Sequence, residues 1–382
     1  MKRILLLISV LFLLLPCLSI SACAEEESPA TEAVPPEYTD FLESIPEELR
    51  ELLPDSLFSN DCKTLEDATR SMSHFSYLLR LSLSILGESL PACLSLLASV
   101  CGLLLLSSVL RAFRDGIRSD GIGRAFSFCA SLTVLCILIT RGIDCIERVT
   151  AYFSTLNAVT AALLPLINVL YVAGGNLTAA AASSAGLSVY LTLLEELVGK
   201  SILSFCAICL TLSLVGALDQ SLKTGTLLST VKKNYTTLLT FLMMLLLAML
   251  SAQTVLGARS DSLMMRSAKF AAGNLIPVVG GSISELLRTV SASVGYLRGV
   301  LGISAILLLL LLLLPTVVEL LLLRLTWQIT ASVAELLGCD SEKKLLEEFA
   351  SLCGYLLAAV CICSSVLLLS LCLLVRCASA IG

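Results

Sequence analysis

The residues that could carry chemistry in this chain are few, and their spacing fits no common catalytic arrangement. The chain has one histidine, His74, which lies outside its long apolar stretches. A single histidine excludes the two-histidine helix motif of zinc proteases, and its position excludes a histidine-based serine dyad within a membrane. Gly199-Lys200-Ser201 ends like a phosphate-binding loop, but position 194 is Leu194 rather than glycine, and an apolar stretch follows. The sequence therefore predicts no enzyme, and it indicates no metal or cofactor site.

Cysteine is abundant, with 16 residues, and most of them lie within apolar stretches. Cys206 and Cys209 have C-x-x-C spacing, but no second pair stands near them, and a thiolate would be costly in lipid. We therefore expect the cysteines to act as small apolar side chains, without a disulfide framework.

Charged side chains within apolar stretches are the remaining candidates, because a charge at membrane depth is costly and usually marks a functional path. Glu319 follows Pro315 by one helical turn inside such a stretch. This carboxylate could belong to an ion or solute path, or it could reach the membrane interface near Arg324. Both interpretations stay open.

The elements that must position these residues are apolar helices. Of the 382 residues, 57% are hydrophobic and 14% are charged, whereas a soluble domain averages about 25% charged residues. Lipid must therefore cover much of the surface, and the backbone inside lipid must be helical. We predict an all-α, polytopic membrane bundle of about 6–8 transmembrane helices, and no basic tract suggests nucleic acid. The candidate spans are Ala92–Leu110, Ala125–Thr140, Leu156–Ala173, Leu177–Leu194, Ser201–Leu218, Thr237–Leu256, Leu301–Leu323 and Ala350–Val375.

Lysine and arginine set the expected orientation of these spans. The arginines that follow the first span place that loop in the cytoplasm. With eight spans, the stretch from Gly257 to Gly299 would lie outside, although it also carries several Lys and Arg residues. Either this charge does not affect insertion, or the predicted number of spans is wrong by one. In the second case the small-residue stretch Leu177–Leu194 is the weakest candidate for a span.

The N-terminus is typical of a secretory signal peptide over residues 1–24. Lys2 and Arg3 precede the short apolar run Ile4–Leu15, and Ala22-Cys23-Ala24 offers a cleavage site. Cys23 also ends a lipobox-like sequence, so lipidation is the competing interpretation, and a retained signal anchor is a third. Each of them exports the residues that follow.

Residues 25–70 form an acidic exported segment, and residues 71–382 form the polytopic membrane domain. The exported segment contains Pro46 and Pro54, and from Tyr38 onward its apolar residues recur. It is either a solvated tether or a set of short helices lying on the membrane face or on a partner.

One apolar stretch, Lys269–Gly281, is too broken to be a plain span. A broken backbone at membrane depth must be buried in protein or line a cavity, so this stretch is either a re-entrant or discontinuous helix or an interfacial loop. A faint echo, Ala173-Gly174-Gly175-Asn176-Leu177, follows Pro165, and paired broken segments are typical of transporter repeats. The candidate functional residues of the stretch are Lys269, Phe270, Gly273, Asn274, Pro277, Gly280 and Gly281.

The order of these features resembles the stage III sporulation protein AE family. A signal peptide and an acidic exported segment precede polytopic sequence that carries K-F-A-A-G-N-x-I-P-V-V-G-G, here Lys269–Gly281. A long apolar span containing Pro315 and a final span near the C-terminus also fit that layout. The resemblance covers most of the chain from about Asp67 onward.

The resemblance implies a function in sporulation. Family members belong to an operon-encoded complex of the mother cell, in the membrane that surrounds the forespore, and they face the space between the two membranes. With other stage III sporulation membrane proteins and a forespore-side channel protein, the complex is similar to a secretion channel that supports the forespore after engulfment. The family offers no catalytic residues to transfer. The alternative is a stand-alone secondary transporter or permease, with the broken segments lining its site.

Overall fold

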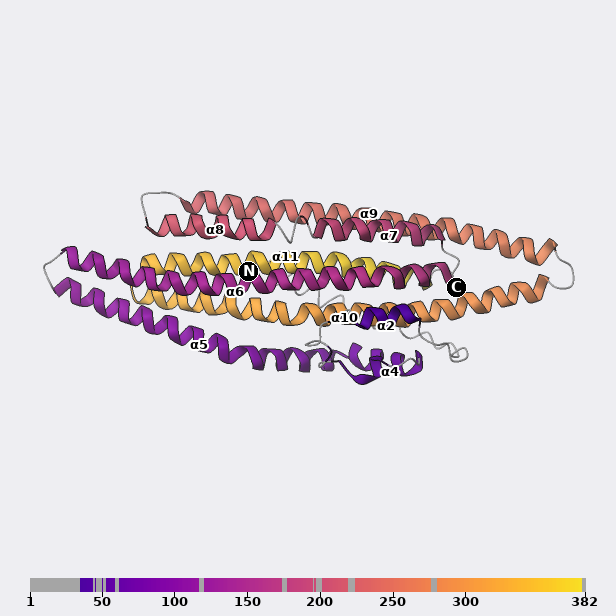
Figure 1. Ribbon diagram of the computed structural model, residues 1–382, viewed down its shortest axis with the longest axis horizontal. Coiled ribbons are helices and arrows are strands. Elements are labelled where there is room, and N and C mark those ends of the chain that lie inside the picture. The colour runs from indigo at the N-terminus through magenta and orange to yellow at the C-terminus, as the bar shows by residue number, and fades with distance from the viewer. Residues whose placement is uncertain are drawn as a thin grey trace.

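Long helices lying side by side make up the computed structural model (Figure 1). The structure describes residues 35–43, 45, 50, 53–58, 62–116, 120–173, 177–194, 196, 201–218, 224–275 and 280–379. Within these ranges every regular element is helical. The predicted all-α class is therefore confirmed, whereas the predicted signal peptide lies outside the described residues.

The helices fall into a short N-terminal group and a long bundle. The N-terminal group consists of α2 (Pro36–Glu43), the 3-10 turn η1 (Asp55–Phe58) and α4 (Cys62–Ser73). The bundle consists of α5 (Phe75–Gly116), α6 (Asp120–Ala173), α7 (Leu177–Leu193), α8 (Ser201–Leu218), α9 (Thr224–Leu275), α10 (Gly280–Leu336) and α11 (Asp340–Ser379).

The centre of the bundle is the antiparallel hairpin of α10 and α11 (Figure 1). The chain reverses at Gly338, whose φ of 70° is a left-handed conformation that glycine adopts without strain. The amide of Cys339 donates to the carbonyl of Ala334 at 2.8 Å, and that of Gly338 donates to Glu335 at 3.1 Å. These bonds satisfy carbonyls at the end of α10, so the reversal is a glycine-terminated helix cap.

The core is built on this hairpin. The leucine run of α10, from Ala305 to Leu313, is buried on every side. The single tryptophan, Trp327, is 1% exposed and packs edge-on against Phe349 of α11, with ring centroids 6.3 Å apart. Several cysteines are buried among these apolar side chains, as expected of small apolar residues, whereas Cys129 and Cys136 are exposed: the buried ones are Cys145, Cys206, Cys209, Cys339, Cys353, Cys361 and Cys363.

Four helices in the described part of the chain are long and apolar enough to cross a membrane. The α11 segment is mostly buried inside the bundle, whereas the α5 segment is mostly uncovered. The total of 6–8 spans stays a prediction. The four segments are Leu79–Val109 of α5, Ile139–Val172 of α6, Val300–Leu336 of α10 and Glu342–Cys372 of α11.

The expectation that Ala125–Thr140 and Leu156–Ala173 are separate spans is wrong. Both belong to the continuous helix α6. The intervening residues Cys145, Val149 and Tyr152 are buried at helical spacing, so this region packs as helix instead of forming a loop. The eight-span path, which reverses the chain between these two stretches, therefore does not hold.

The N-terminal helices pack on the bundle of the same chain. Tyr38 and Phe41 of α2 are 1% and 0% exposed, and α2 contacts α6. Leu65 of α4 is 0% exposed, and α4 contacts α10 and α5. Of the two expectations for this segment, its described residues show short helices, and these pack on the bundle of the same chain. Burial raises the pKa of Tyr38, which lies close to Ser304 of α10, to about 12.

Candidate functional site

Five charged residues at the waist of the bundle form the main candidate site, which we name the charged belt. Arg148 of α6 and Glu319 of α10 form an ion pair with a nitrogen–oxygen distance of 2.7 Å. Arg148 is 65% exposed and Glu319 is 36% exposed, so both can still reach polar surroundings. The predicted charge candidate Glu319 is therefore paired across two helices. The belt consists of Arg148, Lys232, Glu319, Arg324 and Glu348.

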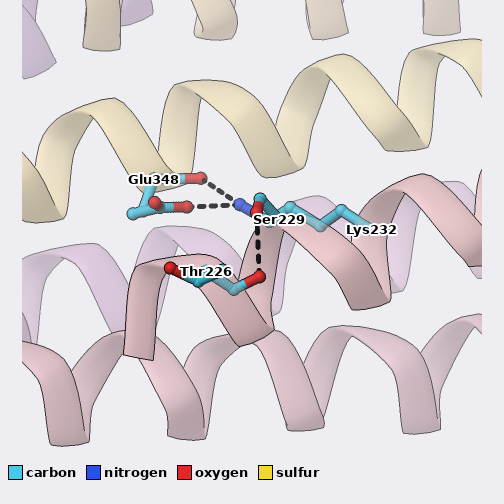
Figure 2. Close-up of polar contacts among 4 residues, drawn as sticks. All are labelled: Thr226, Ser229, Lys232 and Glu348. Carbon is cyan, nitrogen blue, oxygen red and sulfur yellow. Dashed lines mark hydrogen bonds and ion pairs between the residues drawn. The ribbon is translucent and has the colours of Figure 1, made fainter. Parts of the chain in front are cut away.

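The second pair of the belt is buried. The ammonium of Lys232 on α9 contacts a carboxylate oxygen of Glu348 on α11 at 2.5 Å and lies 3.5 Å from the Glu348 carbonyl (Figure 2). The Lys232 side chain is only 3% exposed, whereas that of Glu348 is 34% exposed. The ring of Tyr355 lies 6.0 Å from the ammonium. A buried lysine needs such a partner, so this pair fixes the register of α9 against α11.

The belt residues lie close together along the bundle axis. The guanidinium of Arg324 rests on Gly354 of α11, where an added Cβ would stand 3.0 Å from its Cζ. The thiol of Cys145, one turn before Arg148 on α6, lies close to that of Cys353. Because Glu348, Cys353 and Gly354 fall within two turns of α11, both ion pairs occupy one short section of the bundle.

A charge-free region of the bundle, which we name the apolar slab, begins at the belt. Four helices carry no Asp, Glu, Lys or Arg in the segments that run from the belt in one direction. The shortest segment, on α10, is as long as the roughly 20 residues that cross 30 Å of hydrocarbon. Residues at the edge of such a slab would lie at a membrane boundary. The segments are 149–173 of α6, 234–258 of α9, 299–318 of α10 and 349–375 of α11.

The chemistry available at the belt is electrostatic. Its ion pairs join helices that are distant in sequence, α6 to α10 and α9 to α11. Among the described residues, no group of three His, Cys, Asp or Glu side chains could hold a metal ion. His74 lies far along the chain from the belt, exposed at the bend between α4 and α5. The arrangement can therefore align helices and mark a boundary.

The structure places the broken motif at the junction of α9 and α10. Lys269, Phe270, Gly273 and Asn274 lie in the last turns of α9, and Gly280 and Gly281 begin α10. Pro277 lies outside the described residues. The ends of α9 and α10 reach beyond the other helices at one end of the bundle (Figure 1). The motif and the belt are therefore separate regions.

Sequence reasoning missed the pair of Lys232 and Glu348. A signal for it was present, because Lys232 and Lys233 stand directly before one charge-free segment and Glu348 before another. What the pattern lacked was the pairing of α9 with α11, which are separated by the whole of α10.

Comparisons with known proteins agree on one family. The sequence profile described as stage III sporulation protein AE matches residues 63–378. A curated protein named Stage III sporulation protein AE, from Bacillus subtilis (strain 168), is 21% identical over 338 residues. That alignment covers 87% of this chain and 83% of the relative. No solved structure matches the chain.

Proposed function

This chain belongs to the stage III sporulation protein AE family, and from that membership we propose that it is a membrane subunit of a channel complex joining mother cell and forespore. The complex would be similar to a secretion apparatus and would support forespore development after engulfment. The observation that carries the proposal is the family match over residues 63–378. The profile covers nearly all of the helices that build the bundle.

The architecture supports a subunit of a larger assembly. The apolar segment of α5, Leu79–Val109, is mostly uncovered, so much of its surface is free to contact lipid or other proteins. The hairpin of α9 and α10 reaches beyond the other helices and carries the family motif at its end. An exposed helix and a projecting hairpin are features through which a subunit can contact its neighbours.

The proposed location is the mother-cell membrane around the forespore. The signal-like N-terminus would export the acidic segment, which would face the space between the two membranes while its helices α2 and α4 pack on the bundle. The partners would be the other stage III sporulation membrane proteins and the forespore-side channel protein, together with lipid. The proposed subunit is not an enzyme, since it would act through helix packing and assembly.

Co-purification tests this proposal. The chain, tagged at its C-terminus, would be solubilised with mild detergent from membranes of sporulating cells and purified. We expect the other stage III membrane proteins to co-purify in fixed ratio, and an unrelated tagged polytopic protein from the same cells serves as the control. Recovery of the chain alone, together with substrate-dependent flux in liposomes that contain only this chain, would favour the stand-alone transporter instead.

A further inference from the structure

The first half of α5 lies alongside the apolar slab. On α5 and α10, which run in the same direction, the side chain of Cys93 lies close to Thr326, and the Ser108 hydroxyl donates to the Leu337 carbonyl at 3.3 Å. This register places the residues before Cys93 beside the part of α10 that precedes Thr326. At 1.5 Å per residue, Arg80 and Ser76 therefore lie beside the charge-free segment 299–318.

The N-terminal helices extend along the same section. Tyr38 of α2 lies close to Ser304, which belongs to the charge-free segment of α10. Helix α4 contacts α10 and continues beyond the beginning of α5 along the bundle (Figure 1). The face formed by α4 and the first turns of α5, residues 62–80, therefore covers part of one side of the apolar slab, and we name it the polar face.

Two opposite sides of the slab differ in chemistry. Helices α7 and α9 lie on one side of the central hairpin, and α4 and α5 lie on the other (Figure 1). The α9 side exposes Phe241 at 65%, Met244 at 68% and Met249 at 43%, within a stretch that has no charged residue. The polar face instead exposes Lys63, Asp67, Arg70 and Arg80, whereas the rest of the first half of α5 exposes leucines, among them Leu83 at 58% and Leu94 at 53%.

Lipid can cover the apolar α9 side, whereas contact of lipid with the polar face is unfavourable. A lysine, arginine or aspartate at the centre of a bilayer is strongly unfavourable on insertion scales. The polar face carries several of them at slab depth, and three belong to the 12-residue helix α4.

The backbone of the polar face gives a second, independent argument. Helix α4 ends at Ser73, the chain bends at His74, and α5 begins at Phe75. Helix ends leave amide and carbonyl groups without partners inside the helix. At membrane depth such irregular backbone must be buried in protein or face water, and His74 is exposed.

We propose that the polar face lines a water-filled space at membrane depth, while α7 and α9 face lipid. The polar face lies on the outside of the bundle, so one copy cannot enclose water and neighbouring subunits must close the space. The inference thus rests on the proposed channel complex and adds which wall of this subunit faces the lumen. Charges of both signs on the wall suit passage of hydrated solutes.

Cysteine accessibility in native membranes tests the assignment. Ser76→Cys and Met249→Cys are matched positions, because Ser76 lies about 25 Å along α5 from Cys93, and Met249 lies about 25 Å along α9 from Lys232. Membranes from sporulating cells would be treated with a charged, water-soluble maleimide, and labelling would be read at each position by peptide mass spectrometry. Native cysteines then do not interfere. Ala334→Cys, at a position that is 0% exposed, is the buried control.

We expect Ser76→Cys to label at least about tenfold faster than Met249→Cys, because maleimide reacts with the thiolate, which does not form in lipid. Equal rates at the two positions would overturn the inference. So would a Ser76→Cys thiol that labels in detergent but not in membranes, since lipid or protein would then cover the polar face.

A second pair of variants serves if a cysteine variant fails to accumulate. Met249→Glu should strongly reduce the amount of inserted protein, and Ser76→Glu should leave it unchanged. The reverse order would contradict the inference. Normal sporulation without the chain would refute the proposed function but would leave the labelling pattern to be judged separately.

Discussion

The pair of Lys232 and Glu348 yields an asymmetric prediction, because its two side chains are unequally buried. In Glu348→Gln, Lys232 would remain 3% exposed without a countercharge. Removing one partner of a buried pair costs about 3–5 kcal/mol. In Lys232→Met, Glu348 would remain 34% exposed and could be hydrated. We expect that loss to be about 1 kcal/mol, in the range of a partly exposed pair.

The double variant Lys232→Met/Glu348→Gln should recover most of the loss, because it leaves no unpaired charge. It should lie within about 1 kcal/mol of the parent chain, which gives a coupling energy of about 3–5 kcal/mol between the two sites. A pair that merely touched at the surface would couple by less than about 1 kcal/mol.

The chain offers its own reporter for this measurement. Trp327 is the single tryptophan, and it packs against Phe349, the residue that follows Glu348. Unfolding by sodium dodecyl sulfate in mixed micelles, followed by tryptophan fluorescence, would give the free energy of unfolding of each variant. Equal losses for the two single variants, or no loss in Glu348→Gln, would refute the burial of Lys232 and the pairing of α9 with α11.

Three further predictions concern packing and the motif. Gly142→Ala should destabilise the bundle by about 1–2 kcal/mol, since the added Cβ would stand 2.9 Å from the Phe349 ring. The control is Gly87→Ala, whose added Cβ meets nothing within 4 Å. It should be neutral or slightly stabilising in the same unfolding assay. Equal effects would count against the packing of α6 on α11. Mild oxidation should join Cys145 to Cys353 by a disulfide, because the two thiols lie close together. After proteolysis, the fragments from α6 and α11 should then stay linked until a reductant is added. If both thiols can be alkylated but never cross-link, the proximity of Cys145 and Cys353 is contradicted. Alanine at Pro277 should lower complex assembly and sporulation, and normal levels of both would remove the proposed importance of the motif.

The general class of this fold could be predicted from composition alone. Low charge and long apolar stretches require helices in lipid, and the described residues are helical throughout their regular elements. The ends of the helices were harder to predict from the sequence. Residues 141–155 contain Arg141, Asp144 and Arg148, which interrupt an apolar stretch and suggest a loop. The interior of α6 tolerates them because they lie on its exposed side while Cys145, Val149 and Tyr152 are buried.

The candidate site was predictable in part. Glu319 stood out because it is charged within an apolar stretch, and the structure pairs it with Arg148. Neither the partner nor the pair of Lys232 and Glu348 could be predicted, since both depend on which helices are neighbours. Helix order along the chain does not determine that arrangement. The motif Lys269–Gly281 carried the family resemblance, and its position at the end of a projecting hairpin needed the structure.

The central claim is that this chain is a membrane subunit required for forespore development. The most direct measurement is the number of heat-resistant spores formed by a spore-forming host that lacks the chain, with the stage of arrest read by membrane-dye microscopy. We expect engulfed forespores that fail to mature, and restoration by a plasmid copy of the parent chain. Parental numbers of heat-resistant spores without the chain would contradict it.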